Sequence, residues 1–93
     1  MKEIKKITAR IVSVLNEQMS NFGGTYFVIK LKGEDGENYD VVPSSNCETY
    51  NEWKKISANI GQRYSGLQYL MEKNGNKFVN KEVIPKCIEQ KLF

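Results

Sequence analysis

Hydrophobic and polar positions alternate most clearly over residues 25–32. The hydrophobic face of this segment consists of three side chains, Phe27, Ile29 and Leu31. The opposite face consists of four, Tyr26, Val28, Lys30 and Lys32. A period of two, in a segment rich in β-branched and aromatic residues, predicts a half-buried strand.

A turn and a returning strand follow this segment directly. Residues 33–36 read Gly-Glu-Asp-Gly, and the pair Asp35-Gly36 supplies the positive φ that a tight hairpin requires. Residues 39–42 form the returning strand, which ends at Pro43 because proline cannot donate a hydrogen bond to the ladder. The two segments together predict a β-hairpin with one hydrophobic face and one face rich in tyrosine and lysine.

A long first strand is predicted over residues 4–15. Its hydrophobic positions alternate with polar ones at three places, Ile7, Ala9 and Ile11. The phase slips near Ser13, as it does at a β-bulge or a sharp bend. Residues 16–23 are polar and end in glycine, so we expect a loop there, which carries the hydrophobic side chains Met19 and Phe22.

One amphipathic helix is predicted after the hairpin. Two overlapping capping boxes, Ser45 with Glu48 and Thr49 with Glu52, are typical of a helix start. Hydrophobic side chains then recur at helical spacing at Tyr50, Trp53, Ile56 and Ile60. We expect a helix of about three turns that ends at Gly61 as its C-terminal cap, with the tryptophan in the core.

A second pair of strands is predicted after the helix. Residues 62–71 form the fourth strand, and Gly66 in its middle indicates a bulge or a kink. Residues 72–77 form a hairpin turn around Asn74-Gly75, which is the strongest short hairpin signal. The fourth strand and the strand after this turn are therefore expected to pair.

The fifth strand is predicted over residues 78–84, before Pro85, and a short tail with one helical turn over residues 86–93. The order of elements predicts an all-β fold with one helix, which lies between strands 3 and 4. A bent first strand and a glycine-kinked fourth strand favour closure into a five-stranded Greek-key barrel, which removes sheet edges. We expect one domain over residues 1–93, with the barrel at about residues 4–85.

Charge and composition narrow the possible functions. The 93 residues carry a net charge of +3, with lysine and arginine concentrated in residues 1–15 and 54–81. This distribution is compatible with a polyanionic partner, although a solvated lysine-rich surface is the commoner explanation of any one cluster. The acids gather at the hairpin tip, residues 34–40, where they are expected to form a solvated turn.

Catalytic chemistry is not visible in the sequence. There is no histidine, no glycine-rich phosphate loop and no metal-ligand spacing, and Cys47 and Cys87 are far apart, which favours two reduced thiols. We therefore expect no enzyme, no metal and no cofactor. No segment resembles a signal peptide or a membrane span, so we expect a cytoplasmic protein without membrane contact.

The order of elements resembles an OB-fold, the oligonucleotide- and oligosaccharide-binding barrel. The hairpins at Asp35-Gly36 and Asn74-Gly75 are similar to those of small single-stranded-DNA-binding proteins of phages, plasmids and other mobile elements, as is the segment 61–64. The resemblance implies non-enzymatic binding of single-stranded DNA, or RNA, in replication or recombination. Bases would stack on aromatic rings and lysines would contact phosphates.

The resemblance also implies a binding surface. The outer face of strands 2 and 3, the loop between strands 1 and 2 and the turn between strands 4 and 5 would form this surface. The candidate binding residues are Tyr26, Lys30, Lys32, Phe22, Arg10, Arg63, Lys73 and Lys77. Tyrosine and lysine on the wet face of a strand are also good β-formers and solubilising residues that need no ligand.

Two alternatives to nucleic-acid binding follow from hydrophobic side chains expected at the surface. In the first, the chain is a protein-interaction or inhibitor module from a mobile element, with Met19, Phe22, Leu92 and Phe93 as anchors. Two of these residues, Leu92 and Phe93, could also join copies of the chain into a homo-oligomer. In the second alternative, the domain is a structural subunit of a larger complex. Binding of duplex DNA is disfavoured because the predicted helix buries its hydrophobic face and leaves no basic recognition helix.

Overall fold

The computed structural model describes residues 5–19 and 23–88. Within these ranges the chain forms strands and one α-helix in a fixed order: β1 (Lys6–Met19), β2 (Thr25–Gly33), β3 (Asn38–Val41), α1 (Tyr50–Ser57), β4 (Arg63–Lys73), β5 (Asn76–Val79) and β6 (Lys86–Cys87). Within the described part of the chain, no helix is long and apolar enough to cross a membrane.

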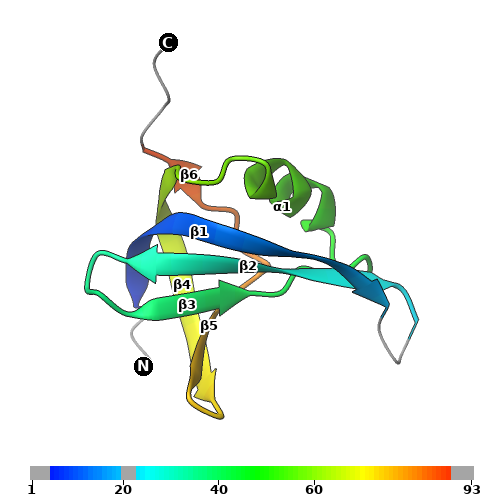
Figure 1. Ribbon diagram of the computed structural model, residues 1–93, viewed down its shortest axis with the longest axis horizontal. Coiled ribbons are helices and arrows are strands. Elements are labelled where there is room, and N and C mark those ends of the chain that lie inside the picture. Colours follow the sequence, from blue (N-terminus) through cyan, green and yellow to red (C-terminus); the bar gives the residue numbers. More distant parts are fainter. Residues whose placement is uncertain (1–4, 20–22, 89–93) are drawn as a thin grey trace.

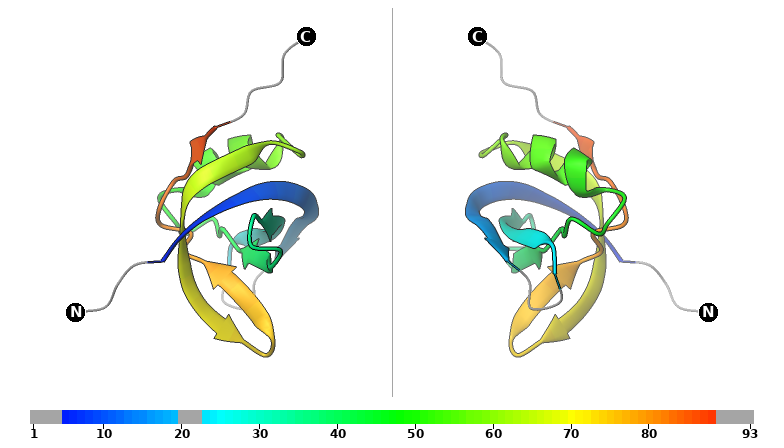
Figure 2. Two further views of the ribbon diagram at one scale, coloured as in Figure 1. Left: turned by 90° about the vertical axis from the view of Figure 1, so that its left-hand side faces the viewer. Right: turned by 90° about the vertical axis from the view of Figure 1, so that its right-hand side faces the viewer.

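Five of the strands form a closed ring. The strands pair in the order β1-β2-β3-β5-β4, and β4 pairs with β1 to complete the circuit. The β3–β5 pair is parallel and the other pairs are antiparallel. Figure 1 shows β1, β2 and β3 side by side with β4 crossing behind them, and in both views of Figure 2 the β4–β5 hairpin projects on the side opposite α1.

The structure confirms the predicted alternation in β2 and shows that β1 is longer than predicted. Phe27, Ile29 and Leu31 are buried, and a register shift of β1 against β2 lies between Ile11 and Ser13, where the phase slips in the sequence. The loop expected at residues 16–23 is wrong over its first part, because β1 continues to Met19. These last residues of β1 are exposed, so the hydrophobic pattern cannot report a strand that is held by pairing with β2 alone.

The second hairpin forms at the predicted turn. Asn74 has a φ of 53° and Gly75 a φ of 80°, the two positive values that a two-residue primed turn requires. Gly66 has a φ of 81°, and the β1–β4 register shifts beside it, so the predicted irregularity of β4 is confirmed. Such a conformation favours glycine because other residues adopt it only with strain.

The fifth strand is shorter than predicted. β5 ends at Val79 because the side-chain oxygen of Asn80 accepts a hydrogen bond from the backbone N–H of Glu82 at 3.0 Å, which turns the chain. After this turn β6 pairs with the start of β4, so the single helical turn expected over residues 86–93 is wrong at its first two residues. The rest of that tail lies outside the described residues, apart from Ile88.

The helix is buried through Trp53 and Ile56, as its spacing predicts. Trp53 is 0% exposed, and its indole N–H donates a 2.6 Å hydrogen bond to the carbonyl of Lys81, beyond β5. Tyr50 contacts Phe27 edge to face, and Lys54 forms an ion pair with Glu17 of β1. The helix therefore contacts β1, β2 and the segment after β5.

The helix begins where the second capping box predicts, with Thr49 as its N-cap residue, but its cap bond and its C-terminal end differ from the prediction. The Thr49 hydroxyl makes no cap bond and instead donates to the Lys81 carbonyl at 2.6 Å, so a tertiary contact replaces the capping box. The helix ends at Ser57 with Ala58 as its C-cap, and Ile60 is 51% exposed. Gly61 has a positive φ, but its N–H bonds to the carbonyl of Ile11 in β1 instead of closing the helix.

A buried tyrosine donates a hydrogen bond to a carboxylate at the β2–β3 turn. The Tyr39 hydroxyl, 1% exposed as a residue, donates a 2.7 Å hydrogen bond to Asp35, whose other oxygen accepts the N–H of Glu37. Two causes raise the pKa of Tyr39 to about 12: burial of the hydroxyl, which is the larger, and its hydrogen bond to the Asp35 carboxylate. The pKa of Asp35 is lowered mainly by the hydrogen bond from the Glu37 N–H and, to a smaller extent, by the one from the Tyr39 hydroxyl.

The raised pKa of Tyr39 predicts a loss of stability in a defined pH window. Its contribution is fully present below the unfolded-state pKa near 10 and is lost as the pH rises through about 12. A shift of this size corresponds to about 2–3 kcal/mol of unfolding free energy. Tyr39→Phe should therefore lose less stability between pH 8 and 11.5 than the wild type does, measured by urea unfolding.

The half-exposed Tyr26 provides the matched control for this experiment. Tyr26→Phe removes one phenol and leaves every lysine in place, so it should retain the full alkaline loss. Equal pH profiles for Tyr39→Phe and the wild type would show that the buried phenol does not set the alkaline limit.

Candidate nucleic-acid interface

The outward side chains of β2 continue into a row that crosses four strands. In the registers of the ring, Lys30 lies opposite Asp40 of β3, Asp40 lies beside Phe78 of β5, and Phe78 lies opposite Met71 of β4. Side chains directly opposite one another in neighbouring strands lie on the same face of a sheet. The predicted lysine of β2 and an unpredicted aromatic ring of β5 therefore share the outer face of the ring.

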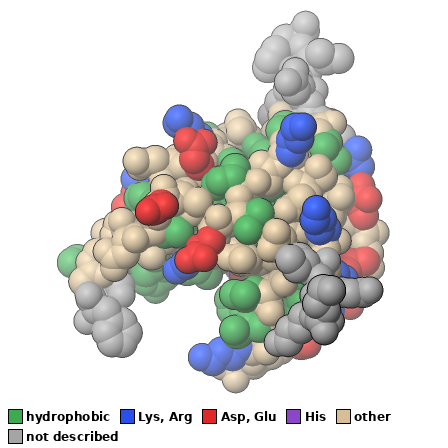
Figure 3. Space-filling model, turned by 180° about the vertical axis from the view of Figure 1, so that it is seen from behind, with side chains coloured by type: hydrophobic (Ala, Val, Ile, Leu, Met, Phe, Trp, Pro, Cys, Tyr) green, Lys and Arg blue, Asp and Glu red, His purple; other side chains and the backbone are tan. Residues whose placement is uncertain are grey.

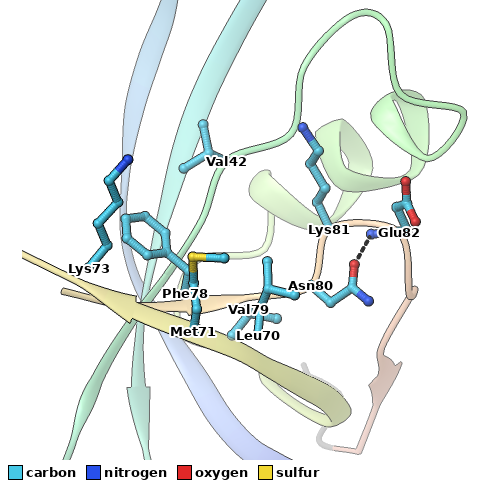
Figure 4. Close-up of a pocket in the computed structure, with 9 residues that line it drawn as sticks. All are labelled: Val42, Leu70, Met71, Lys73, Phe78, Val79, Asn80, Lys81 and Glu82. Carbon is cyan, nitrogen blue, oxygen red and sulfur yellow. Dashed lines mark hydrogen bonds between the residues drawn. The ribbon is translucent and has the colours of Figure 1, made fainter.

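An apolar groove opens beside this row. Its lining includes five hydrophobic side chains, Val42, Leu70, Met71, Phe78 and Val79, and four polar or charged residues, Lys73, Asn80, Lys81 and Glu82. The groove has a volume of about 520 Å³, within the range of small-molecule pockets. Figure 4 shows Lys73 and Lys81 pointing in the same direction on either side of Phe78 and Val42.

Two of the five hydrophobic residues of the apolar groove are accessible to solvent, and Val79 is buried. Leu70 is 53% exposed and Met71 is 48% exposed, whereas Phe78 is half-buried. In Figure 3 hydrophobic side chains gather beside a hollow at the lower edge of the molecule. Exposed hydrophobic side chains grouped around a concavity are typical of a contact surface.

The two lysines of the apolar groove are available for a ligand. Among the described residues, no acidic side chain lies within ion-pair distance of Lys73 or Lys81. The backbone of Lys81 is held by the two hydrogen bonds to its carbonyl from Thr49 and Trp53. Its position is therefore fixed by the core while its side chain stays half-exposed.

Three predicted binding residues are engaged in ion pairs within the protein. Lys30 pairs with Asp40 at 3.3 Å, Lys77 with Glu37 at 3.2 Å, and Arg63 with Glu34 at 2.7 Å. The hydrogen bond that Lys77 donates to Glu37 raises the pKa of this lysine. These carboxylates offset part of the positive charge that the sequence led us to expect on this surface.

The predicted residues gather into two further hollows. Lys30 and Lys77 line one of about 380 Å³, between the outer face of β1, β2 and β3 and the β4–β5 turn. Arg10, Lys32 and Arg63 line another of about 240 Å³, together with Gly33 and Glu34. In the second hollow Arg10 lies opposite Lys32 on β2, and its guanidinium donates to the carbonyl of Gly61.

The remaining predicted residues are placed separately. Tyr26 is half-buried on β2 and donates a 3.0 Å hydrogen bond to Gln18 of β1. Lys73 lines the apolar groove, and the other predicted cations do not. Phe22, like Leu92 and Phe93, lies outside the described residues, whereas Met19 is 81% exposed at the end of β1.

Sequence reasoning missed the hydrophobic half of this surface. Phe78 belongs to a strand of only four residues, too short for its alternation to show which face is buried. Leu70 and Met71 are adjacent, and a register shift between Tyr69 and Met71 leaves both of them exposed. The available signal was the spacing of Lys73, Phe78 and Lys81 around the Asn-Gly turn.

The thiols and acids of the described residues form no metal site. Cys47 and Cys87 are both reduced thiols, half-buried and exposed respectively, as the sequence predicts. No group of three or more cysteine, aspartate or glutamate side chains among these residues is arranged to hold a metal ion. The sequence matches no protein-family model and no curated protein.

Proposed function

We propose that this protein is a non-enzymatic single-stranded nucleic-acid-binding protein with an OB-fold-like Greek-key barrel, and that single-stranded DNA is its ligand. The five-stranded ring and its strand order are compatible with such a barrel. In OB-folds, oligonucleotides lie across strands 2 and 3 and the adjoining hairpin loops. The apolar groove and the outward face of β2 are the corresponding surfaces of this chain.

The apolar groove is the observation that carries the proposal. A base that enters it can stack on Phe78 and contact Met71, while Lys73 and Lys81 lie on either side for the flanking phosphates. Stacking on an aromatic ring is tolerant of sequence because every base has a π-face. We therefore expect binding with little base specificity and a strong dependence on salt.

Single strands fit this surface better than a duplex does. The helix buries Trp53 and Ile56 in the core, and its basic residues Lys54 and Lys55 are ion-paired with Glu17 and Glu52. A duplex reader needs a helix or ribbon that is free to enter a groove, and stacking on Phe78 requires an unpaired base. Duplex DNA of the same length should compete poorly.

The test is fluorescence anisotropy of a labelled oligo-dT at low and at physiological salt, with duplex as competitor. Wild-type protein should bind, and binding should weaken steeply as salt rises. The double variant Lys73→Gln/Lys81→Gln should bind at least ~10-fold more weakly and reduce the salt slope by about 0.7 for each phosphate that is no longer neutralised. Absence of binding at low salt would overturn the proposed function.

A matched control separates direct binding from net charge. Lys55→Gln/Lys86→Gln lowers the charge equally, on the helix and on β6, away from the apolar groove. This variant should bind the oligonucleotide within about 2- to 3-fold of wild type, because exposed charges beyond a Debye length are largely screened. An equal reduction of affinity in both double variants would indicate attraction by overall charge alone.

A protein partner is the second candidate, favoured by the exposure of Leu70, Met71 and Met19. Such a partner would bury these side chains, and the interface would respond little to salt. An oligonucleotide that fails to bind, together with a salt-insensitive complex in a pull-down, would favour this candidate.

A further inference from the structure

Three acidic residues of the β2–β3 hairpin each neutralise a cation on a different strand. Glu34, Glu37 and Asp40 follow one another at intervals of three along the turn and β3. Their partners are Arg63 of β4, Lys77 of β5 and Lys30 of β2. One short segment therefore contributes a carboxylate to each of three cations around the proposed interface.

The exposure of the partners shows which group a ligand meets first. In the pair of Lys77 with Glu37 the side chains are 26% and 55% exposed, and in the pair of Arg63 with Glu34 they are 35% and 57% exposed. In these two pairs the acid is the outer, more exposed partner. In the third pair Lys30 is the outer partner, at 45% against 16% for Asp40.

We propose that these three carboxylates are affinity-determining residues that keep the nucleic-acid surface partly neutralised until a strand binds. This inference rests on the proposed function. A phosphate must take the place of a carboxylate on each cation, and the displaced carboxylate remains nearby as a like charge. The apolar groove is not masked in this way, so stacking on Phe78 and contact with Lys73 and Lys81 would initiate binding, and exchange at the other cations would follow.

The exchange is physically accessible because exposed ion pairs are weak and are screened by salt. Ligands with isolated carboxylates or single phosphates would gain little by replacing one carboxylate with another anion. A polyanion that also stacks its bases can replace several carboxylates together. The acids would therefore favour single strands over other anions, in exchange for a lower absolute affinity.

The test compares two triple variants that carry the same charge. Glu34→Gln/Glu37→Gln/Asp40→Asn removes the masking carboxylates, and Glu17→Gln/Glu48→Gln/Glu52→Gln removes three acids elsewhere, two of them also ion-paired with lysines. The first variant should bind oligo-dT at least ~10-fold more tightly than wild type, with a salt slope steeper by up to ~2, since each unmasked cation adds about 0.7. The second should change affinity by less than ~3-fold, with an unchanged slope.

A double-mutant cycle makes the test independent of long-range charge. Glu37→Gln alone should tighten binding, and this gain should disappear in the Lys77→Met background, because the carboxylate, the more exposed partner of this pair, then has no cation to mask. Equal gains in both backgrounds, or equal gains in the two triple variants, would overturn the inference while leaving the proposed function intact. Failure of both the wild type and the unmasked variant to bind oligo-dT at low salt would overturn the proposed function and this inference with it.

Discussion

Replacing Trp53 with alanine is expected to lower the free energy of unfolding by about 3–5 kcal/mol. The indole is 0% exposed and belongs to the hydrophobic core inside the ring. Removing it leaves a cavity and also removes the hydrogen bond from the indole N–H to the carbonyl of Lys81. Because domains of this size are stable by roughly 5–15 kcal/mol, the loss would be a large share of the total.

Urea unfolding followed by circular dichroism measures this loss. Trp53→Phe retains most of the ring volume and loses the N–H donor, so it should cost about 1–3 kcal/mol and fall between the wild type and the alanine variant. Lys55→Ala, on the exposed face of the same helix, should stay within about 0.5 kcal/mol of wild type. An alanine variant of Trp53 whose unfolding free energy stays within about 1 kcal/mol of wild type would contradict the assignment of this side chain to the core.

The parts of the fold that the sequence predicts correctly are those with local signals. The alternation of Phe27, Ile29 and Leu31 predicts the buried face of β2, and Asn74-Gly75 predicts a hairpin because its two residues adopt positive φ. Gly66 predicts an irregular strand for the same reason. Each of these features is decided by residues within a few positions of one another.

The errors arise where a pairing partner decides the outcome and the local hydrophobic pattern does not. Thr49 has the sequence of a helix cap, yet its hydroxyl bonds to Lys81, which is 32 positions away. The last residues of β1, up to Met19, carry no hydrophobic pattern, and only the ladder with β2 keeps them extended. The pattern of hydrophobic positions reveals neither interaction, because the first joins distant residues and the second is a backbone ladder with exposed side chains.

The candidate site shows the same limit in its charges. The sequence places lysines and arginines on the outer face correctly, but the ion pair of Arg63 with Glu34 joins residues 29 positions apart. Likewise the pairing of Lys77 with Glu37 requires β3 and β5 to be neighbours, and this parallel pair forms only when the ring closes. The number of cations could be counted from the sequence, whereas their neutralisation could not.

Replacing Phe78 with alanine is expected to raise the Kd for oligo-dT by ~5- to ~150-fold, because stacking contributes about 1–3 kcal/mol per base. Phe78 lies in the apolar groove between Lys73 and Lys81, and it is the aromatic side chain in the lining of that groove. The change should leave the salt slope near its wild-type value, since it removes no charge. This pattern is opposite to that of the Lys73→Gln/Lys81→Gln variant, in which affinity and salt slope should fall together.

Two further substitutions separate stacking from simple hydrophobic contact at this position. Phe78→Leu retains a hydrophobic side chain without a π-face and should lose most of the affinity that Phe78→Ala loses, whereas Phe78→Trp should bind at least as tightly as wild type. Because Phe78 is only half-buried, urea unfolding should show that each variant remains folded under the binding conditions. If Phe78→Leu binds as tightly as wild type, the groove offers hydrophobic contact and not base stacking. This result would favour a protein as the partner of the groove. If Phe78→Ala binds as tightly as wild type, the strand lies along the outer face of β2 and does not enter the groove.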